Sequence, residues 1–344
     1  MEDLLFTGGW PEDFRAGFVA VLGRPNVGKS TLINAMVGRK IAITSARPET
    51  TRHVARGIVH RDKFQLVLVD TPGIHRPRTL LGKRLNDMVE EAQADVDLIV
   101  FCVPADQEIG PGDRRIVEKQ LRPHSKIPAV AVVTKTDAAS REQIAAQLLE
   151  VSELYDFEDI VPVSARVGDQ VQLLIDLLGG LMPLSPPLYP EGQDSDEDTE
   201  IMIAELIREA ALEGLGQELP HSLAVQVEEI IKSPGGGGFS KGLPVSKSGP
   251  GESGGFSKGE PETLENPGKR RKSETWRILV NLFVERDSQK SIVIGRKGSR
   301  LKEIGTRARP QIEELLGRHV FLDLHVRTAK DWQQDPKMLN RLGL

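Results

Sequence analysis

Residues 23–30 read Gly-Arg-Pro-Asn-Val-Gly-Lys-Ser, a spacing that builds a cradle for phosphate groups. Gly23 and Gly28 allow the backbone to turn its N–H groups inward toward an anion. Lys29 can then reach the β- and γ-phosphates of a nucleotide, and the hydroxyl of Ser30 can bind magnesium. The same cradle takes in the remaining loop residues, Arg24, Pro25, Asn26 and Val27. Such a loop must lie between a strand and a helix, which restricts this part of the chain to few folds.

Hydrophobic patterns on both sides of the loop agree with this placement. Residues 18–22 form a short apolar run typical of a strand, and residues 30–37 carry apolar positions at helical spacing. Similar patterns alternate up to about residue 183, with strands predicted at 64–69, 98–103, 129–133 and 160–163 and helices at 113–121, 141–154 and 171–178. Alternation predicts an α/β domain of the P-loop NTPase class, with a mostly parallel sheet and helices on both faces. One antiparallel strand is expected near 57–60.

Length and charge indicate a second domain with a different partner. The chain has 344 residues, which predicts about two domains. Its net charge is −5, yet residues 269–344 carry 18 basic and 9 acidic side chains, so the rest of the chain is strongly acidic. A basic block of this kind suggests a polyanion as partner, with ordinary surface charge as the alternative.

Cysteine usage and the start of the chain bear on location. The single cysteine, Cys102, lies in an apolar strand-like run and is interpreted as a small buried hydrophobe. The absence of a disulfide framework fits a reducing cytoplasm. Residues 1–5 do not resemble a secretory signal, and no run approaches 18 apolar residues, so neither export nor a membrane span is expected.

Composition divides the rest of the chain. Residues 191–200 contain six acids and are expected to be solvated, extended chain. Residues 232–272 contain eleven glycines and two copies of Gly-Gly-Phe-Ser-Lys-Gly, which predicts a disordered insertion. Alternating strands and helical patterns flank it and predict a second domain of the α+β class. The predicted division is a tail at 1–16, a first domain at 17–183, a linker at 184–200, a second domain at 201–231 and 273–330, and a tail at 331–344.

Two motifs after the phosphate loop can complete a site for magnesium and a γ-phosphate. The first, Asp70-Thr71-Pro72-Gly73, follows the predicted strand at 64–69. Asp70 can hold a magnesium-bound water, and the Gly73 N–H can meet the γ-phosphate. The second, Glu49-Thr50-Thr51-Arg52, lies before the second strand, where Thr51 is placed to complete the magnesium coordination.

Two other motifs can recognise a base. Thr134-Lys135-Thr136-Asp137 follows the strand at 129–133. The Asp137 carboxylate can accept hydrogen bonds from both N1–H and the amino group of guanine, which adenine does not offer, while the stem of Lys135 covers the base. A backbone N–H of Ser164-Ala165, after the next strand, can reach guanine O6. Each motif alone could be an ordinary turn, but their shared order at strand ends predicts a guanine nucleotide site.

These residues together resemble the translation-factor-related class of bacterial GTPases, through the phosphate loop, Thr-Thr-Arg-His at 50–53 and Asp-Thr-Pro-Gly at 70–73. Residues 293–305, Val-Ile-Gly-Arg-Lys-Gly-Ser-Arg-Leu-Lys-Glu-Ile-Gly, resemble the RNA-binding KH domain of Era-type GTPases. One GTPase domain followed by one type II KH domain is specific to the Era type. The resemblance implies GTP hydrolysis with Mg²⁺, GTP and GDP as ligands, and switch residues Glu49, Thr50, Thr51, Arg52 and His53.

Two positions depart from common GTPase patterns. Thr134 stands where this family usually has Asn, whose amide ties the base-recognition motif to the phosphate loop; a Thr hydroxyl can donate one such bond. Ile74 stands where Ras-like enzymes carry the Gln that orients the attacking water. The resemblance therefore implies slow intrinsic hydrolysis. It also suggests that Asn26 helps to hold a potassium ion in place of an arginine finger, with activation by an RNA or ribosome partner as the alternative.

The loop Gly295-Arg296-Lys297-Gly298 predicts an RNA contact. The two glycines allow close approach to a nucleic-acid backbone, and Arg296 and Lys297 stand at the tip. Residues 288–310 contain seven basic side chains and one acidic, among them Arg300 and Lys302. A turn between two helices on a charged surface is the alternative. The family resemblance implies the 3′ end of small-subunit ribosomal RNA and the 30S subunit as partners, and no DNA.

The predicted function is a GTP-hydrolysing switch that binds 16S ribosomal RNA and assists maturation of the 30S subunit. The residues assigned to catalysis are Lys29, Asp70, Gly73, Asn26 and Thr51, and those assigned to the metal are Ser30, Thr51 and Asp70. One alternative is an RNA-binding checkpoint whose nucleotide state gates binding while hydrolysis is incidental, as Ile74 suggests. Another is a peripheral membrane regulator at the inner face of the cell membrane.

Overall fold

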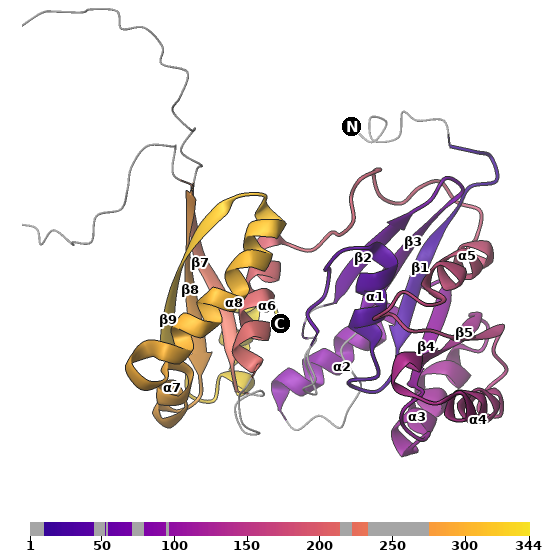
Figure 1. Ribbon diagram of the computed structural model, residues 1–344, viewed down its shortest axis with the longest axis horizontal. Helices are drawn as coiled ribbons and strands as arrows, with labels where there is room; N and C mark the ends of the chain where they lie inside the picture. Colours follow the sequence, from indigo (N-terminus) through magenta and orange to yellow (C-terminus); the bar gives the residue numbers. More distant parts are fainter. Residues whose placement is uncertain are drawn as a thin grey trace, which may run out of the picture.

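The computed structural model describes residues 10–44, 52, 54–70, 79–93, 96–213, 222–232 and 275–344. These residues form two domains joined by an extended segment (Figure 1). Each domain has its own sheet and its own apolar core. The insertion predicted at 232–272 lies outside the described residues, apart from Lys232 at the end of a strand.

The first domain is built on a sheet of six strands in the order β2-β3-β1-β4-β5-β6. The strands are β1 (Arg15–Leu22), β2 (Ala55–His60), β3 (Phe64–Asp70), β4 (Leu98–Pro104), β5 (Ala129–Thr134) and β6 (Asp159–Pro162). Only β2 runs antiparallel to its neighbour; the other pairs are parallel. The predicted mostly parallel sheet and its antiparallel exception are therefore confirmed.

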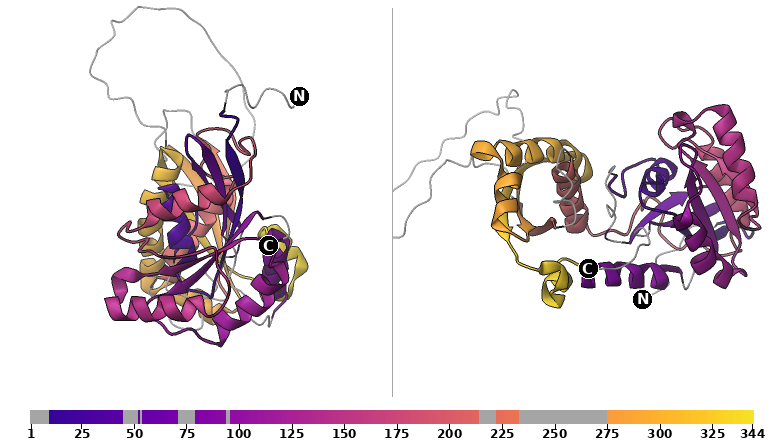
Figure 2. Two further views of the ribbon diagram at one scale, coloured as in Figure 1. Left: turned by 90° about the vertical axis from the view of Figure 1, so that its right-hand side faces the viewer. Right: turned by 90° about the horizontal axis from the view of Figure 1, so that it is seen from below.

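Helices cover both faces of this sheet because successive strand residues point to opposite sides. In β1, Val19 packs in the cluster that includes α1 (Lys29–Val37) and α5 (Val171–Leu181). The next residue, Ala20, packs in the opposite cluster with α3 (Pro111–Ile116) and α4 (Arg141–Ser152). The helix predicted at 113–121 is shorter than expected, because the regular helix α3 passes into a π-helical turn at Val117–Leu121 and a 3₁₀ turn at Arg122–His124. The remaining helix, α2 (Leu80–Gln93), extends toward the second domain (Figure 2).

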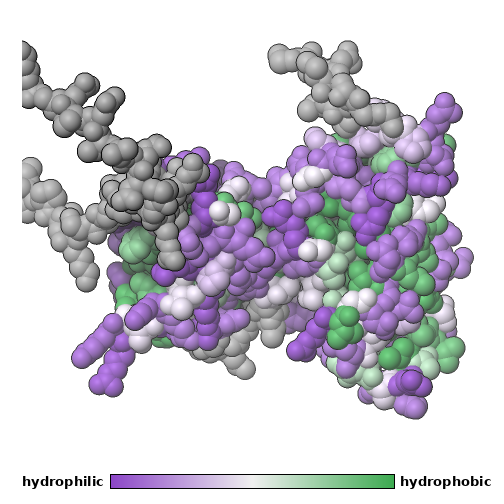
Figure 3. Space-filling model, turned by 45° about the horizontal axis from the view of Figure 1, so that its top comes forward, coloured by the Kyte–Doolittle hydropathy of each residue, from purple (hydrophilic) through white to green (hydrophobic). Residues whose placement is uncertain are grey.

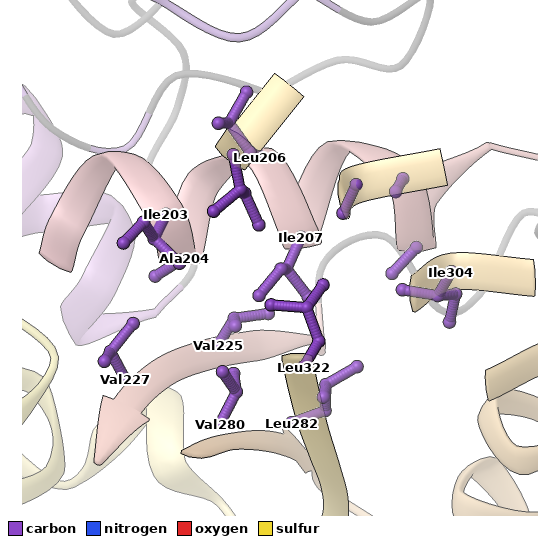
Figure 4. Close-up of a cluster of buried hydrophobic side chains, with 14 of the residues drawn as sticks. Ile203, Ala204, Leu206, Ile207, Val225, Val227, Val280, Leu282, Ile304 and Leu322 are labelled. Carbon is purple, nitrogen blue, oxygen red and sulfur yellow. The ribbon is translucent and has the colours of Figure 1, made fainter. Parts of the chain in front are cut away.

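The second domain is α+β, as predicted. Its sheet has the order β7-β8-β9, with β7 antiparallel and β9 parallel to β8. Figure 4 shows side chains from α6, all three strands and α8 meeting in one core, Ile207, Leu282 and Ile304 among them. The elements are α6 (Thr199–Leu212), β7 (Ala224–Lys232), β8 (Thr275–Val284), α7 (Asp287–Ile294), α8 (Ser299–Leu316) and β9 (His319–Thr328).

The acidic linker differs from the prediction of solvated chain, because it lines the edge of the first sheet. The Ile58 N–H donates to the carbonyl oxygen of Asp194 over 2.9 Å. The carboxylates of Asp194 and Asp196 pair with Arg39 and Arg56 at 3.0 and 2.9 Å. An edge strand offers unpaired backbone groups, and β2 is such an edge. The composition of the linker shows its acidic residues, but it could not predict that Arg39 and Arg56 of the first domain pair with them.

The segment 331–344, expected to be a tail, is folded. It forms a 3₁₀ turn at Trp332–Gln334 and helix α9 (Pro336–Arg341). Trp332 and Leu339 are fully buried and pack with Leu81 and Leu85 of α2, and Figure 2 shows the C-terminus beside that helix. Burial of these two apolar side chains contributes to the ordering of this segment.

The face of the molecule seen in Figure 3 differs between the domains. Figure 3 shows a mostly hydrophilic visible face on the second domain and larger apolar areas on the first. Exposed apolar residues of the first domain and linker include Leu149, Val167, Leu173 and Leu184. Within the described part of the chain, no helix is long and apolar enough to cross a membrane.

Candidate nucleotide and RNA sites

The phosphate loop lies between β1 and α1, as predicted, and its backbone requires glycine at two places. Gly23 has φ 153°, and a Cβ there would lie 2.7 Å from the carbonyl oxygen of Cys102. Gly28 has φ 104° and precedes the first turn of α1. Asn26 also has a positive φ, 65°. These left-handed conformations belong to a loop that turns its N–H groups inward.

Lys29 is the buried cation of this loop. Its side chain is almost fully buried, and Nζ donates to the carbonyl oxygens of Gly23 and Arg24 at 3.0 Å each. Burial lowers the pKa of Lys29, and the nearby carboxylate of Asp70 opposes that shift. A buried ammonium group favours an anionic ligand, and the bonds that Lys29 makes within the described residues go to two neutral carbonyl oxygens, so the loop is electrostatically suited to phosphate.

Ser30 and Asp70 meet at the end of β3. The Ser30 hydroxyl donates to Asp70 Oδ2 over 2.7 Å, and Asp70 is fully buried. A hydroxyl and a carboxylate beside a phosphate cradle are hard oxygen donors, the ligands that Mg²⁺ prefers. The donor set therefore fits magnesium, with Ser30 and Asp70 as the described residues that would hold it. Such an ion would neutralise charge on the phosphates.

The residues predicted to recognise a base come together after the ends of β5 and β6. Asp137 Oδ1 accepts a 2.6 Å hydrogen bond from the hydroxyl of Ser164, which fixes the carboxylate that was predicted to read guanine. The Ser164 N–H in turn donates to the carbonyl oxygen of Asp169 over 3.1 Å. Lys135 has φ 59°, and its Nζ lies 3.9 Å from the carboxylate of Asp106. Thr136 and Ala165 occupy the same two loops.

Thr134 makes the link that the usual family Asn would make. Its hydroxyl donates to the carbonyl oxygen of Val27 in the phosphate loop over 2.5 Å, as the sequence suggested a Thr hydroxyl could. The bond joins the end of β5 to the loop before α1. The base and phosphate halves of the site are thus held as one unit.

One connection at the loop, between Arg24 and the start of α3, was not predicted from the sequence. The Nε of Arg24 donates to Asp113 Oδ1 over 2.7 Å, and Asp113 is fully buried. Asp113 Oδ2 also accepts from the Gly110 N–H. The pattern Gly-Pro-Gly-Asp is recognisable as a helix start, but its partner Arg24 is 89 residues away in the sequence.

Several predicted residues lie outside the described part of the chain, namely Glu49, Thr50, Thr51, His53, Thr71, Pro72, Gly73 and Ile74. Arg52 is described and is nearly fully buried. It contacts the second domain, where its guanidinium donates to the carbonyl oxygen of Leu223 over 2.7 Å. Cys102 is buried behind the phosphate loop, and burial raises its pKa to about 12, so it behaves as the apolar residue that was predicted.

The basic loop of the second domain forms between α7 and α8. Gly295, Lys297 and Gly298 have φ of 73°, 52° and 78°. Arg296 and Lys297 are exposed at the tip, and Lys302 is exposed on α8. Arg300 has a second use, because its guanidinium donates to the carbonyl oxygens of Ala211 and Glu213 at the end of α6. Sequence reasoning placed Arg300 on the RNA face and did not foresee this contact.

Comparisons with known proteins agree with both domains. Residues 18–135 match the family model described as "50S ribosome-binding GTPase", and residues 269–333 match that of the KH domain. The chain is 53% identical over 332 residues to the GTPase Era of Mycobacterium avium, covering 96% of this chain and 99% of that one. It is also 53% identical to the GTPase Era of a Nocardioides species, covering 96% of each.

Two solved structures resemble this chain over both of its domains. One is Era in complex with MgGDPNP and nucleotides 1506–1542 of 16S ribosomal RNA, with a TM-score of 0.81, 30% identity and coverage of 96% and 99%. The other is a variant of Aquifex aeolicus Era bound to GDP and aluminium fluoride, with the same TM-score, identity and coverage.

Proposed function

Because the chain belongs to the Era family of GTPases, we propose that it is a guanine-nucleotide switch that binds the 3′ end of small-subunit ribosomal RNA and assists maturation of the 30S subunit. The chain is a GTPase that takes magnesium and guanine nucleotide as ligands, and its second domain is a KH domain. The observation that carries the proposal is the Thr134–Val27 bond, which unites the phosphate cradle with the base-reading loop.

In this mechanism Lys29 and the loop N–H groups bind the β- and γ-phosphates. Ser30 and Asp70 would hold magnesium, and we assign Thr51 and Gly73 to the terminal phosphate. Asp137, fixed by Ser164, reads the guanine edge. Release of the γ-phosphate frees the two switch segments, which is the usual route from hydrolysis to a change of conformation.

A potassium ion beside Asn26 is the proposed source of extra positive charge. The positive φ of Asn26 turns the loop backbone at this point, and an amide oxygen is a suitable ligand for a hard cation. Hydrolysis should be faster in potassium than in sodium at matched ionic strength, and Asn26→Ala should abolish the difference. Equal rates in both salts would exclude the ion.

The proposed RNA contact uses the tip residues Arg296 and Lys297, with Lys302 on α8. Arg300 adds to it less directly, since its guanidinium also holds the end of α6. The glycines bring a nucleic-acid backbone close, and the cations neutralise its phosphates.

The test combines nucleotide and RNA binding on the purified protein. With Mg²⁺, guanine nucleotides should bind more tightly than adenine nucleotides by roughly two orders of magnitude or more, because the base-reading groups are left unpaired by adenine. Asp137→Ala should remove most of that preference. A synthetic RNA of the small-subunit 3′ end should bind more tightly than a scrambled one, and loss of either selectivity would contradict the proposal.

The second candidate is the checkpoint in which hydrolysis is incidental, and Ile74 favours it because an apolar side chain cannot orient water. Single-turnover hydrolysis with and without 30S subunits distinguishes the switch from the checkpoint, since the subunits should accelerate GTP hydrolysis only if the protein is a switch. We place the protein in the cytoplasm. A peripheral contact with the inner membrane face is a further proposal, tested by sedimentation with anionic vesicles.

A further inference from the structure

The second domain holds both residues that flank the first switch segment. Residues 45–51, which include Thr51, lie between Thr44 and Arg52 in the sequence. Thr44 and Arg52 belong to the first domain, yet each bonds a residue of the second domain. The first anchor belongs to α6, and the second combines the residues just before β7 with Trp332 after β9.

Glu209 of α6 is the first anchor. Its carboxylate is nearly buried and accepts from the Thr44 N–H over 2.8 Å and from the Thr44 hydroxyl over 3.3 Å. The same carboxylate forms an ion pair with Lys40, whose Nζ also donates to Gln311 of α8 over 2.6 Å. A largely buried carboxylate with several donors is a rigid attachment, because losing any partner would leave a buried charge poorly compensated.

Trp332 is the centre of the second anchor. The guanidinium of Arg52 lies 5.5 Å above its ring, and the same guanidinium donates to the carbonyl oxygen of Leu223. The ring is fully buried, and its Nε1 donates to the carbonyl oxygen of Ser222 over 2.9 Å. A cation over an indole face is attracted by the ring's quadrupole, and the attraction is stronger where water is excluded.

Trp332 also contacts the element that follows the second switch motif. It packs with Leu81 of α2, whose first residue donates its backbone N–H to Gln334 over 3.1 Å. Arg84 of the same helix donates to Asn340 over 2.7 Å. One side chain thus touches the end of the first switch segment and the helix after the second.

We propose that Glu209 and Trp332 are positioning residues for GTP hydrolysis, so that the second domain forms part of the GTPase machinery. They act through Thr44, Arg52 and α2 and do not touch the nucleotide. This inference rests on the proposed function, which assigns the terminal phosphate to the switch motifs. The Era structures that resemble this chain over both of its domains hold MgGDPNP or GDP with aluminium fluoride. The anchors therefore favour the arrangement that accompanies a filled γ-phosphate position.

A coupling of this kind must be reciprocal. If docking of the second domain stabilises the switch segments around a triphosphate, then loss of the anchor contacts weakens the binding of GTP analogues relative to that of GDP. The same coupling means that a bound triphosphate strengthens the docking around Trp332. The ratio of the two nucleotide affinities is therefore the quantity to measure, since a general loss of fold would weaken both.

The test uses the full chain with Glu209→Leu and Trp332→Leu as loss variants. We expect each to weaken GDPNP binding about 10-fold and to slow single-turnover hydrolysis by a similar factor, with GDP affinity within about 2-fold of the parent. Trp332→Phe keeps a ring beneath Arg52 and should restore part of the effect. Two matched controls replace a Glu and a Trp that lie elsewhere in the second domain. Glu213, which pairs with Arg307, is replaced in Glu213→Gln, and Trp276, which lies beside Lys232 and Arg318, is replaced in Trp276→Phe. Both variants should match the parent.

A second measurement does not depend on disrupting the anchor. Replacing Trp10 and Trp276 by Phe leaves Trp332 as the only tryptophan of the chain. Its emission should differ between the GDPNP-bound and GDP-bound protein. Unchanged emission, or loss variants with the parent's ratio of GDPNP to GDP affinity, would overturn the inference while leaving the proposed function intact. A parent protein that binds neither nucleotide would instead refute the proposed function.

Discussion

The hydroxyl of Thr134 donates to the carbonyl oxygen of Val27, so a residue at the end of β5 bonds directly to the phosphate loop. Thr134 is nearly fully buried, and the same hydroxyl lies 3.3 Å from the carbonyl oxygen of Val103. A hydroxyl has one proton to donate, and the shorter bond is the one to Val27. That hydroxyl proton therefore adds a direct link between the two loops, beyond the pairing of β1, β4 and β5 in one sheet.

Removing that hydroxyl should weaken the binding of all guanine nucleotides. Thr134→Val keeps the shape of the side chain but leaves the Val27 carbonyl without this partner, a loss of about 1–2 kcal/mol, or roughly 5- to 30-fold in affinity. GTP and GDP should be affected alike, because the bond is remote from the γ-phosphate. Thr134→Ser retains the donor and should bind like the parent. Titration with a fluorescent nucleotide measures both variants, and an unaltered Thr134→Val affinity would show that the link is dispensable.

The pairing of Arg24 with Asp113 should support the phosphate loop from the side of α3. The carbonyl oxygen of Arg24 accepts from Lys29, so the position of Arg24 affects the buried cation of the phosphate loop. Asp113→Ala leaves Arg24 unpaired and removes the bond from the Gly110 N–H, which should cost about 3 kcal/mol of unfolding free energy and weaken GTP and GDP binding together.

The exposed ion pair between Arg114 of α3 and Glu150 of α4 provides the control for this prediction. Glu150→Ala should change the unfolding free energy by less than about 0.5 kcal/mol, since exposed ion pairs contribute little. Chemical denaturation compares the two variants. If Asp113→Ala is no more destabilised than Glu150→Ala, the buried pair does not support the loop.

The parts of this molecule that follow local rules could be predicted from its sequence. The phosphate loop, the strand ends that carry Asp70 and Asp137, and the G-x-x-G turn depend on neighbours in the sequence, where spacing and residue type are sufficient. The pairing of Arg24 with Asp113 and the contact of Arg52 with Trp332 join residues far apart in the sequence, which no local pattern encodes. The folded segment after β9 was missed for the same reason, since Trp332 is buried only by partners such as Leu81 on α2.

The tip of the G-x-x-G loop should contribute charge to RNA binding without contributing to stability. Arg296 and Lys297 are exposed, so Arg296→Ala with Lys297→Ala should leave the unfolding free energy within about 0.5 kcal/mol of the parent. RNA affinity should fall, and the slope of log affinity against log salt should become shallower by about 1 to 2, because up to two phosphate contacts are lost.

Gly295→Ala provides the contrasting variant for this loop. A Cβ at Gly295 would lie 2.6 Å from the Cβ of Arg300, and its φ is 73°. The loop itself should therefore be distorted, with a loss of both stability and RNA affinity. Filter binding over a range of salt concentrations, together with thermal unfolding, distinguishes the two variants. If the Arg296→Ala, Lys297→Ala double variant keeps the parent's salt slope, the tip is not part of the RNA site.

Glu197 should make the protein less stable as the pH rises. Burial, followed by the nearby Glu205 carboxylate, raises the pKa of Glu197 from 4.5 to about 8. In the unfolded chain the carboxyl loses its proton near pH 4.5, whereas in the folded chain it keeps it to higher pH. The folded state thus binds more protons across this interval, and the unfolding free energy must fall as the pH increases from about 5 to 8.

Glu197→Gln, which cannot ionise, tests this pH dependence. It should be more stable than the parent by roughly 1–2 kcal/mol at pH 8 and little different at pH 5. The expected gain is smaller than the full pKa shift would give, because the Glu197 side chain is partly exposed. Urea unfolding at both pH values measures this, with Glu191→Gln on the exposed part of the linker as the control. An equal effect of Glu197→Gln at pH 5 and pH 8 would show that the carboxyl is already ionised in the folded protein.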